Sequence, residues 1–378
     1  MAFKIKIRSD FPSPLQTRLL RQVCRHRDRH EVYVSHFNRF GLSGARLLLI
    51  YFSDEPDSLP FLLKISRFEK AESEYNSTKV LESYVQDAGF AARRIFSAND
   101  SSGKKWGAVL YSHQATDRPE EAANPRALRE LIYDRKTSLS ELRSILNEVF
   151  EKLNNAHSRR RPKRVLLQAY FKRYFRKHQA RDRIRCVLGP DADSEEIKFL
   201  GTQIYNPLRY LDALPKFANL CIAPVHGDLH PDNIIIHRTE IPHIIDFAWA
   251  HKSRDVLIDF VLLENSFRFM AFPRPINLAD QLRVDKALVH ETGFNQVASL
   301  NFCSPEHRRD YARLACAIEV IRERARAALG DNFSMQRYLL TQFILLYGLL
   351  RYNEYEPYAS TRALGLIAAR LKKIGLPS

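Results

Sequence analysis

Three polar residues, Asp228, Asn233 and Asp246, stand at the ends of short apolar runs. Residues 225–236 read Val-His-Gly-Asp-Leu-His-Pro-Asp-Asn-Ile-Ile-Ile, and Ile244-Ile245 precede Asp246. This pattern predicts a strand–loop–strand unit that presents the three side chains together. Their oxygen atoms suit phosphoryl transfer, which needs an oriented hydroxyl, divalent cations and charge neutralisation but little covalent help from the protein. The pattern therefore predicts an ATP-dependent phosphotransferase.

Within this unit the three residues have different predicted roles. Asp228 is the predicted catalytic base, because its loop would be open to the acceptor hydroxyl. Asn233 and Asp246 are the predicted Mg²⁺ ligands, and two protein ligands suffice because Mg²⁺ keeps several waters and bridges phosphates. His226 is expected to pack and to hold the loop. The alternative interpretation is a pair of strand-end acids in a polar loop, since isolated motifs also occur without function.

A lysine and a helical glutamate are predicted to contact the nucleotide. Lys64 follows the apolar run Pro60–Leu63, and a lysine at such a position can reach the α- and β-phosphates of ATP. Glu74, ten residues later, lies on the inward stripe of a predicted helix and can pair with Lys64. Glu72 lies on the neighbouring face and is the competing partner. An ordinary edge lysine is the alternative interpretation of Lys64.

A short glycine-containing loop, Gly41-Leu42-Ser43-Gly44, separates two predicted strands. Glycines let backbone N–H groups approach phosphates closely, so Gly41, Ser43 and Gly44 are predicted to bind ATP. The loop is no Walker A motif, because no Gly-Lys-Ser/Thr follows it. Glycine hairpins are common, so an ordinary turn is the alternative.

The order of predicted elements indicates an α+β fold with two lobes. Strand signals dominate residues 30–117, and they are expected to form a small β-rich, nucleotide-binding lobe. Residues 118–378 are mostly helical and are expected to form a large lobe with the catalytic loop and an acceptor region. Residues 1–29 are expected to be a leader with a helix from Ser13. A chain of 378 residues is long enough for this organisation.

These motifs resemble the signature of the aminoglycoside phosphotransferase and choline kinase group of protein-kinase-like enzymes. The resemblance rests on His226-Gly227-Asp228, Asn233 and Ile245-Asp246, with Lys64 upstream in the matching order, and it spans roughly residues 30–265. It implies a bilobal protein-kinase-like fold that binds ATP and Mg²⁺ and phosphorylates a hydroxyl acceptor. The chain departs from the pattern at Ser253-Arg254, where the antibiotic kinases often have a glycine, and in its glycine-poor phosphate loop.

A second resemblance joins Gly41–Ala45 with the run Asp255-Val256-Leu257-Ile258-Asp259-Phe260. These segments are similar to the kinase-like ternary-complex-associated domains of bacterial conflict systems. The family likeness implies that Asp259 is a structural acid that braces the catalytic loop. It also supports an alternative function, a nucleotide-binding pseudokinase that acts as a sensor or scaffold.

The composition limits where the protein acts. No stretch reaches the ~20 apolar residues of a membrane span, and the N-terminus lacks the apolar core of a signal peptide. The five cysteines are scattered without Cys-x-x-Cys spacing, which argues against a disulfide framework or a zinc site and favours a reducing, cytoplasmic compartment. No membrane partner is therefore expected.

Charge is concentrated in residues 159–185, here called the basic segment. It holds twelve lysine or arginine residues against one acid, a net charge of +11 in a chain with a formal charge of +16. Aromatic residues at 170, 171, 174 and 175 alternate with cations at a spacing of three and four, which predicts a helix with aromatics on one face. A solvated helix face is one interpretation; an anionic acceptor or a nucleic acid is the other. The expected phosphoryl acceptor is a small-molecule or a macromolecular hydroxyl compound.

Overall fold

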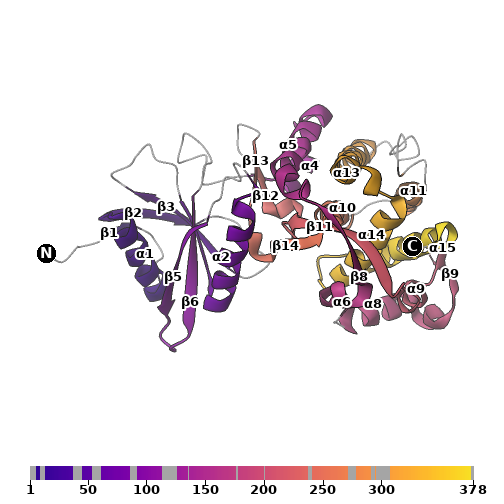
Figure 1. The fold of residues 1–378 in the computed structure, drawn as a ribbon, viewed down its shortest axis with the longest axis horizontal. Helices are drawn as coiled ribbons and strands as arrows, with labels where there is room; N and C mark the ends of the chain where they lie inside the picture. Colours follow the sequence, from indigo (N-terminus) through magenta and orange to yellow (C-terminus); the bar gives the residue numbers. More distant parts are fainter. Residues whose placement is uncertain are drawn as a thin grey trace. The chain divides into compact units, whose positions relative to one another are not determined.

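The computed structural model describes residues 6–8, 13–36, 45–52, 61–85, 92–112, 126–134, 136–175, 178–199, 201–236, 241–270, 278–290, 294 and 307–375. The chain forms two compact units, each made of segments that are distant in the sequence (Figure 1). The first unit comprises Met1–Leu128, Glu151–Asn155 and Asp232–Lys252. The second comprises Arg129–Phe150, Ala156–Pro231 and Ser253–Ser378. The expected α+β class is confirmed, with a sheet-bearing unit and a mostly helical one.

A six-stranded sheet in the order β1-β2-β3-β4-β6-β5 forms the centre of the first unit. Strand β1 runs parallel to β2, and the other neighbours are antiparallel. The elements of the unit are β1 (Lys6–Arg8), α1 (Pro14–Arg27), β2 (Glu31–His36), β3 (Arg46–Phe52), β4 (Phe61–Arg67), α2 (Phe68–Glu82), β5 (Ala92–Asn99), β6 (Lys105–Ser112), β7 (Arg126–Ala127), β12 (Ile234–Ile236), β13 (Pro242–Ile244) and the 3-10 turn η3 (Phe247–Trp249).

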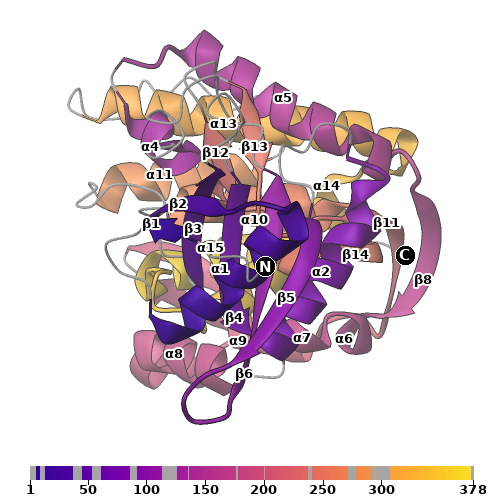
Figure 2. The ribbon, with the colours of Figure 1, turned by 90° about the vertical axis from the view of Figure 1, so that its left-hand side faces the viewer.

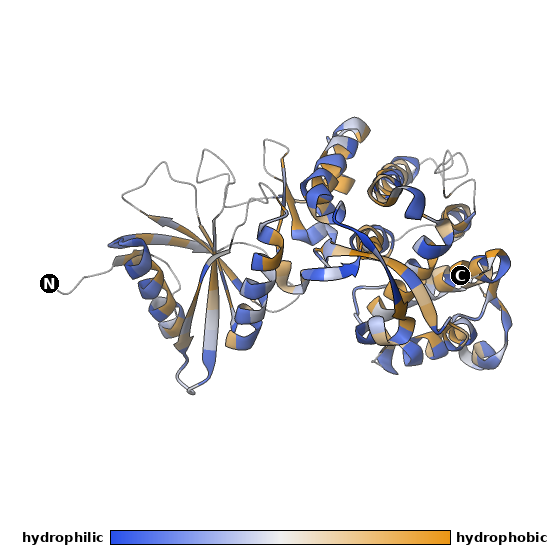
Figure 3. Cartoon of the chain, viewed as in Figure 1, coloured by the Kyte–Doolittle hydropathy of each residue, from blue (hydrophilic) through white to orange (hydrophobic). Residues whose placement is uncertain are grey.

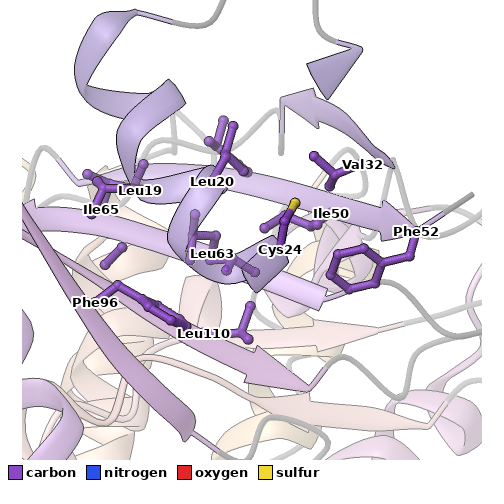
Figure 4. Close-up of a cluster of buried hydrophobic side chains, with 13 residues drawn as sticks. Leu19, Leu20, Cys24, Val32, Ile50, Phe52, Leu63, Ile65, Phe96 and Leu110 are labelled. Carbon is purple, nitrogen blue, oxygen red and sulfur yellow. The ribbon is translucent and has the colours of Figure 1, made fainter. Parts of the chain in front are cut away.

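Both faces of this sheet are apolar, because successive side chains of a strand point to opposite faces and β3 and β4 are apolar along nearly their whole length. On one face, Ile50 and Leu63 pack with Leu19, Leu20 and Cys24 of α1 (Figure 4). In Figure 2, which faces the first unit, α1 lies in front of the strands. The other face carries a second cluster with Ala71 of α2: Leu47, Leu49, Leu62, Val109 and Tyr111.

Strand β1 and helix α1, which fall within the expected leader, belong to this unit. Helix α1 begins after Ser13, whose hydroxyl accepts from the Gln16 N–H while the Gln16 side chain accepts from the Ser13 N–H. This reciprocal cap satisfies two donors that a helix start otherwise leaves open. The structure also assigns Asp232–Lys252 to the first unit, so the units differ from the expected segments 1–29, 30–117 and 118–378.

The second unit contains most helices. Its elements are α4 (Leu128–Tyr133), α5 (Leu139–His157), β8 (Arg161–Leu166), α6 (Leu167–Tyr170), α7 (Lys172–Phe175), α8 (His178–Leu188), η1 (Gly189–Asp193), β9 (Glu196–Phe199), β10 (Thr202–Tyr205), α9 (Pro207–Asp212), β11 (Phe217–Val225), η2 (Pro231–Asn233), β14 (His251–Asp255), α10 (Leu257–Phe269), α11 (Leu278–Val289), α13 (Arg308–Leu329), η4 (Gly330–Asn332), α14 (Met335–Leu349) and α15 (Pro357–Ile374). Of these elements, α4, α5, η2 and β14 also have residues in the first unit. Helix α10 is buried along its full length. Among the described residues, no helix has the length and apolar character that a membrane span requires.

A buried carboxylate joins the central helices of this unit. Glu264 of α10 accepts hydrogen bonds from Arg322 of α13 at 2.7 and 2.8 Å, and from Tyr338 and Gln342 of α14 at 2.7 Å each. Arg268 lies 3.4 Å away. Burial raises the pKa of Glu264, but the arginines outweigh it and hold the pKa at about 2. The stability that this ionised group contributes is therefore present above pH ~4.5 and is lost as the pH falls toward 2.

We expect Glu264→Gln to lower the free energy of unfolding by about 3–5 kcal/mol, because it leaves the guanidinium of Arg322 buried without its counter-charge. Glu323→Gln is the matched control, because Glu323 makes a surface pair with Arg143 and is about half exposed. That change should cost at most ~1 kcal/mol. Urea unfolding of both variants measures the difference, and equal losses would contradict the role of the Glu264 network.

Candidate functional site

Lys64 lies in β4 on the face of the sheet that carries the α2 cluster, and its ammonium contacts two carboxylates. Its Nζ is 3.0 Å from Glu74 Oε2 and 2.9 Å from Asp246 Oδ2. The Lys64 side chain is 8% exposed. Burial alone lowers its pKa, but the negative charges of Asp246 and Glu74 outweigh burial and raise the pKa above its ordinary value. Lys64 is therefore a buried cation at neutral pH.

The structure selects Glu74 over Glu72 as the partner of Lys64. Glu74 is buried in α2 on the stripe of Ala71 and Leu81, whereas Glu72 is exposed. The Tyr111 hydroxyl of β6 donates to the second carboxylate oxygen of Glu74. Burial raises the pKa of Glu74, and the charge of Asp246 adds to this effect while Lys64 opposes it. The carboxylate is thus fixed by two donors from two strands.

The two predicted Mg²⁺ ligands flank one short ladder in the first unit. Ile234 pairs with Ile244 where β12 meets β13, and the Ile245 N–H donates to the Asn233 carbonyl at 2.9 Å. Asn233 immediately precedes β12, and Asp246 follows β13 after one residue, Ile245, so both lie at the same end of the ladder. The Asn233 side chain is buried, and Asp246 is partly exposed.

Asp246 has a left-handed backbone conformation, with φ 61° and ψ 65°. This region is uncommon for residues other than glycine, although aspartate tolerates it better than most. Such conformations cost ~1–3 kcal/mol and persist where the surroundings determine them. Here the turn redirects the chain from β13 into η3 and directs the Asp246 carboxylate to Lys64.

Amide and carboxylate oxygens are donors that Mg²⁺ accepts, so Asn233 and Asp246 fit the implied cation chemically. Among the described residues, no group of three or more histidine, cysteine, aspartate or glutamate side chains could hold a metal ion. A Mg²⁺ ion at these two residues would therefore need further oxygen ligands from water or from phosphates. Phosphates of a nucleotide are one source of such oxygen ligands.

The loop that carries Asp228 belongs to the second unit and is held by a buried acid. Asp259 of α10 accepts from the His226 N–H at 2.9 Å, the Gly227 N–H at 2.7 Å and His157 Nε2 at 3.0 Å. Burial raises the pKa of Asp259, but the hydrogen bond and charge of His157 and the loop donors outweigh it and lower the pKa. The expectation that Asp259 braces this loop is confirmed.

Arg173 and Tyr174 of α7 surround the same loop. Arg173 Nη2 donates to the Gly227 carbonyl at 3.0 Å, and the Arg173 guanidinium lies 4.7 Å from the centre of the Tyr174 ring. Burial raises the pKa of Tyr174, and the negative charge of Asp228 acts in the same direction. Burial and the charge of Arg173 lower the pKa of Arg254. Asp228 thus lies in surroundings with two guanidinium groups and a buried phenol.

Of the predicted site residues, the structure brings Lys64, Glu74 and Asp246 into contact. Gly41, Ser43 and Gly44 lie outside the described residues. Sequence reasoning missed Tyr111, although the pairing of Leu62 with Tyr111 and of Lys64 with Val109 places Tyr111 on the face of Lys64. It also missed His157, for which the sequence offered no signal beyond residue type, and it counted Arg173 only among the cations of the basic segment and not as a contact of the Asp228 loop.

We expect Glu74→Gln to reduce the free energy of unfolding by ~1.5–3 kcal/mol, because charge-assisted contacts with Lys64 and Tyr111 are weakened. Glu72→Gln is the matched control on the same helix and should change stability by no more than ~0.5 kcal/mol. Chemical denaturation of the two variants provides the comparison. A larger effect at Glu72 would exclude Glu74 as the partner that stabilises Lys64.

Comparisons with known proteins name the two groups that the motifs resemble. Similar solved structures include a thermostable mutant of the aminoglycoside phosphotransferase APH(4)-Ia, with 12% identity, a TM-score of 0.45 and coverage of 90% of this chain and 94% of that chain. Another is the choline kinase LicA from Streptococcus pneumoniae, with 11% identity, a TM-score of 0.40 and coverage of 93% and 99%. A third is a MAP kinase from Leishmania major, with 13% identity, a TM-score of 0.35 and coverage of 95% and 98%.

A separate comparison with curated proteins found no match to the sequence. The sequence of residues 172–346 does match a family description, Ternary complex associated domain 9. The matched residues include Asp228, Asn233, Asp246 and Asp259, so they contain the whole strand–loop–strand unit. The resemblance to ternary-complex-associated domains that Asp255–Phe260 indicated is thereby supported over this part of the chain.

Proposed function

We propose that this chain is a phosphotransferase that moves the γ-phosphate of ATP to a hydroxyl acceptor. The observation that carries the proposal is the buried contact of Lys64 with Glu74 and Asp246, at 3.0 and 2.9 Å. A surface lysine at a sheet edge needs no such partners. A lysine that positions phosphates does, because its ammonium must be held in one place while it remains charged.

In the proposed reaction, Lys64 contacts the phosphates and Glu74 holds its ammonium in position. Asn233 and Asp246 would hold Mg²⁺, which when bound neutralises charge that develops on the transferred phosphoryl group. Tyr111 limits the rotation of the Glu74 carboxylate through its hydrogen bond. The protein's own contribution is then positioning and electrostatic stabilisation, as phosphoryl transfer requires.

Asp228 would accept the proton of the acceptor hydroxyl. Its neighbours His226 and Gly227 are held through their backbone N–H groups by Asp259. Gly227 has a φ of 77°, a conformation that glycine adopts without a steric penalty. Asp228→Asn keeps the size and shape of the side chain and removes its charge and its basicity, so it is the suitable change for a mutational test.

A second candidate function is nucleotide binding without turnover. The match of residues 172–346 to Ternary complex associated domain 9 favours it, because that description names an association and no reaction. The two functions differ in one measurable property. Both require nucleotide binding at Lys64, but only the phosphotransferase requires Asp228.

We expect Asp228→Asn to retain ATP affinity while phosphoryl transfer falls by about 10²–10⁴-fold, the usual contribution of a positioned base. Asp232→Asn, a neutralised acid in the same loop, is the matched control and should retain activity. The assay is ATP consumption with sugars, aminoglycosides, choline-like amines, nucleosides, tRNA and proteins as acceptors. Turnover in Asp228→Asn equal to that of the wild type would contradict the role of Asp228 as the base. If the wild-type protein binds ATP but phosphorylates none of these acceptors, the second function is favoured.

We expect Asp246→Ala to weaken the binding of Mg-ATP by at least about tenfold, or ~1.4 kcal/mol. Metal-free ATP should bind the variant no more weakly than it binds the wild type, because the change removes a negative charge near the phosphates and leaves the Lys64–Glu74 contact in place. Titration calorimetry with Mg²⁺ and with a chelator separates the two effects. Equal losses of affinity under both conditions would show that Asp246 is not a metal ligand.

A further inference from the structure

The structure divides the basic segment into two halves with different environments. In the second half, three cations are engaged with the protein. Arg181 forms two hydrogen bonds with Asp212 at 3.0 and 2.9 Å, Arg183 donates to the Leu350 carbonyl at 2.7 Å, and Arg173 holds the Asp228 loop. These residues stabilise the second unit, and they are poor candidates for binding a mobile polyanion.

The first half forms strand β8 rather than a solvated helix face, whereas the aromatic residues at a spacing of three and four lie in and between the short helices α6 and α7. Strand β8 is at the edge of a sheet with the order β14-β11-β8, and within the described part of the chain no strand pairs with its other side. All of its residues except Val165 are exposed. Figure 3 shows β8 hydrophilic along most of its length beside the hydrophobic strand β11. The cationic side chains of β8 are thus exposed to solvent.

Four cations on this ribbon have no acidic partner among the residues that the structure describes. Arg161, Lys163 and Arg164 of β8 and Lys216 beside the start of β11 are exposed. Within the described ranges, none of the four forms a salt bridge with a carboxylate. Successive side chains of a strand point to opposite faces, so Arg161 and Lys163 lie ~7 Å apart on one face of β8, and Arg164 lies on the other face. The exposed edge of the ribbon therefore carries cations on both faces, and their combined positive potential attracts a polyanion.

An aromatic ring lies among these cations. The pairing of Phe217 with Leu166 and of Asn219 with Arg164 places these four side chains on one exposed face. Phe217 is 42% exposed. The Arg164 guanidinium is 4.8 Å and the Lys216 ammonium 5.7 Å from the centre of its ring. A partly exposed ring between cations is the arrangement with which proteins bind an unpaired base and its neighbouring phosphates.

We propose that the ribbon of β8 and the first residues of β11 binds a single-stranded nucleic acid. Arg161, Lys163, Arg164 and Lys216 would contact the phosphates, and Phe217 would stack with a base. A single strand fits better than a duplex, because only an unpaired base offers its face to the ring. A membrane surface fits less well, because the ribbon's exposed apolar side chains are limited to Phe217 and Leu166 and it is no amphipathic helix. The proposal is independent of phosphoryl transfer.

The expected salt dependence follows from the number of contacts. Four neutralised phosphates of a single strand give a slope of about −3 in log affinity against log salt, since each contributes about −0.7. Affinity should therefore fall roughly 50-fold between 50 and 200 mM NaCl. The measurement is fluorescence anisotropy of a labelled 20-nucleotide oligo(dT) or oligo(U) with the full chain.

Two variants separate the phosphate contacts from the stacking contact. The triple change Arg161→Gln, Lys163→Gln and Arg164→Gln should reduce the slope by about 2. Phe217→Ala should weaken binding by roughly 5- to 100-fold at an unchanged slope, because stacking involves no counterion release. All four positions are exposed, so thermal unfolding should be unaffected.

A matched control removes three exposed cations elsewhere in the second unit, Lys198→Gln, Lys286→Gln and Lys373→Gln. This control should bind the oligonucleotide nearly as well as the wild type. Absence of binding at 50 mM NaCl, or an equal loss in the control, would overturn the proposal. Duplex DNA that binds as tightly as the single strand would overturn the stacking contact. Tighter binding to phosphatidylserine vesicles, lost in the same triple variant, would assign the ribbon to a membrane instead.

Discussion

The first unit depends on one buried ammonium group. An unpaired ammonium in an apolar interior is strongly disfavoured, so Lys64 determines which elements must surround it. Glu74 comes from α2 and Asp246 from the turn after β13, and both lie within 3.0 Å of the Lys64 ammonium. The same contact therefore connects the sheet, the helix that follows it in sequence and a hairpin that occurs about 180 residues later. Without Asp246 at this position, the left-handed turn would carry its strain without compensation.

The second unit uses the opposite arrangement, a buried anion surrounded by donors. Asp259 accepts two backbone N–H groups of the loop at 226–227 and the imidazole of His157, and Glu264, one and a half turns further along α10, accepts from two other helices. Helix α10 thus carries two carboxylates that fix a loop and a helical core. Because donors satisfy both groups, the helix can be buried along its full length and still carry charge.

Much of this arrangement follows from local sequence patterns, and the rest depends on contacts between distant segments. The helical period of the stripe through Glu74 predicts that Glu74 faces the interior. The sequence alone did not decide between Glu72 and Glu74 as the partner of Lys64, because only the structure shows which face of the helix packs on the sheet. The contact of Lys64 with Asp246 had no local signal. The aromatic spacing of the basic segment falls in the short helices α6 and α7, but the interpretation of the whole segment as a helix face does not hold for its first part, which pairs with β11 some 50 to 60 residues later and forms a strand. The sequence shows where the cations of the basic segment are concentrated, but only the pairing of β8 with β11 shows which of them face solvent.

The contact of Asp246 with Lys64 has a consequence for the order in which ligands bind under the proposed function. A divalent cation that approaches Asp246 alone meets the positive charge of Lys64 next to the same carboxylate, and two like charges at this distance repel strongly in a partly buried site. Nucleotide phosphates would offset both positive charges and give Lys64 a new partner when Asp246 turns to the metal. Under the proposed function, the electrostatics of Lys64 and Asp246 would therefore favour joint binding of Mg²⁺ and nucleotide over either ligand alone. This coupling needs no movement of α2, because Glu74 remains paired with Lys64 and with Tyr111 throughout.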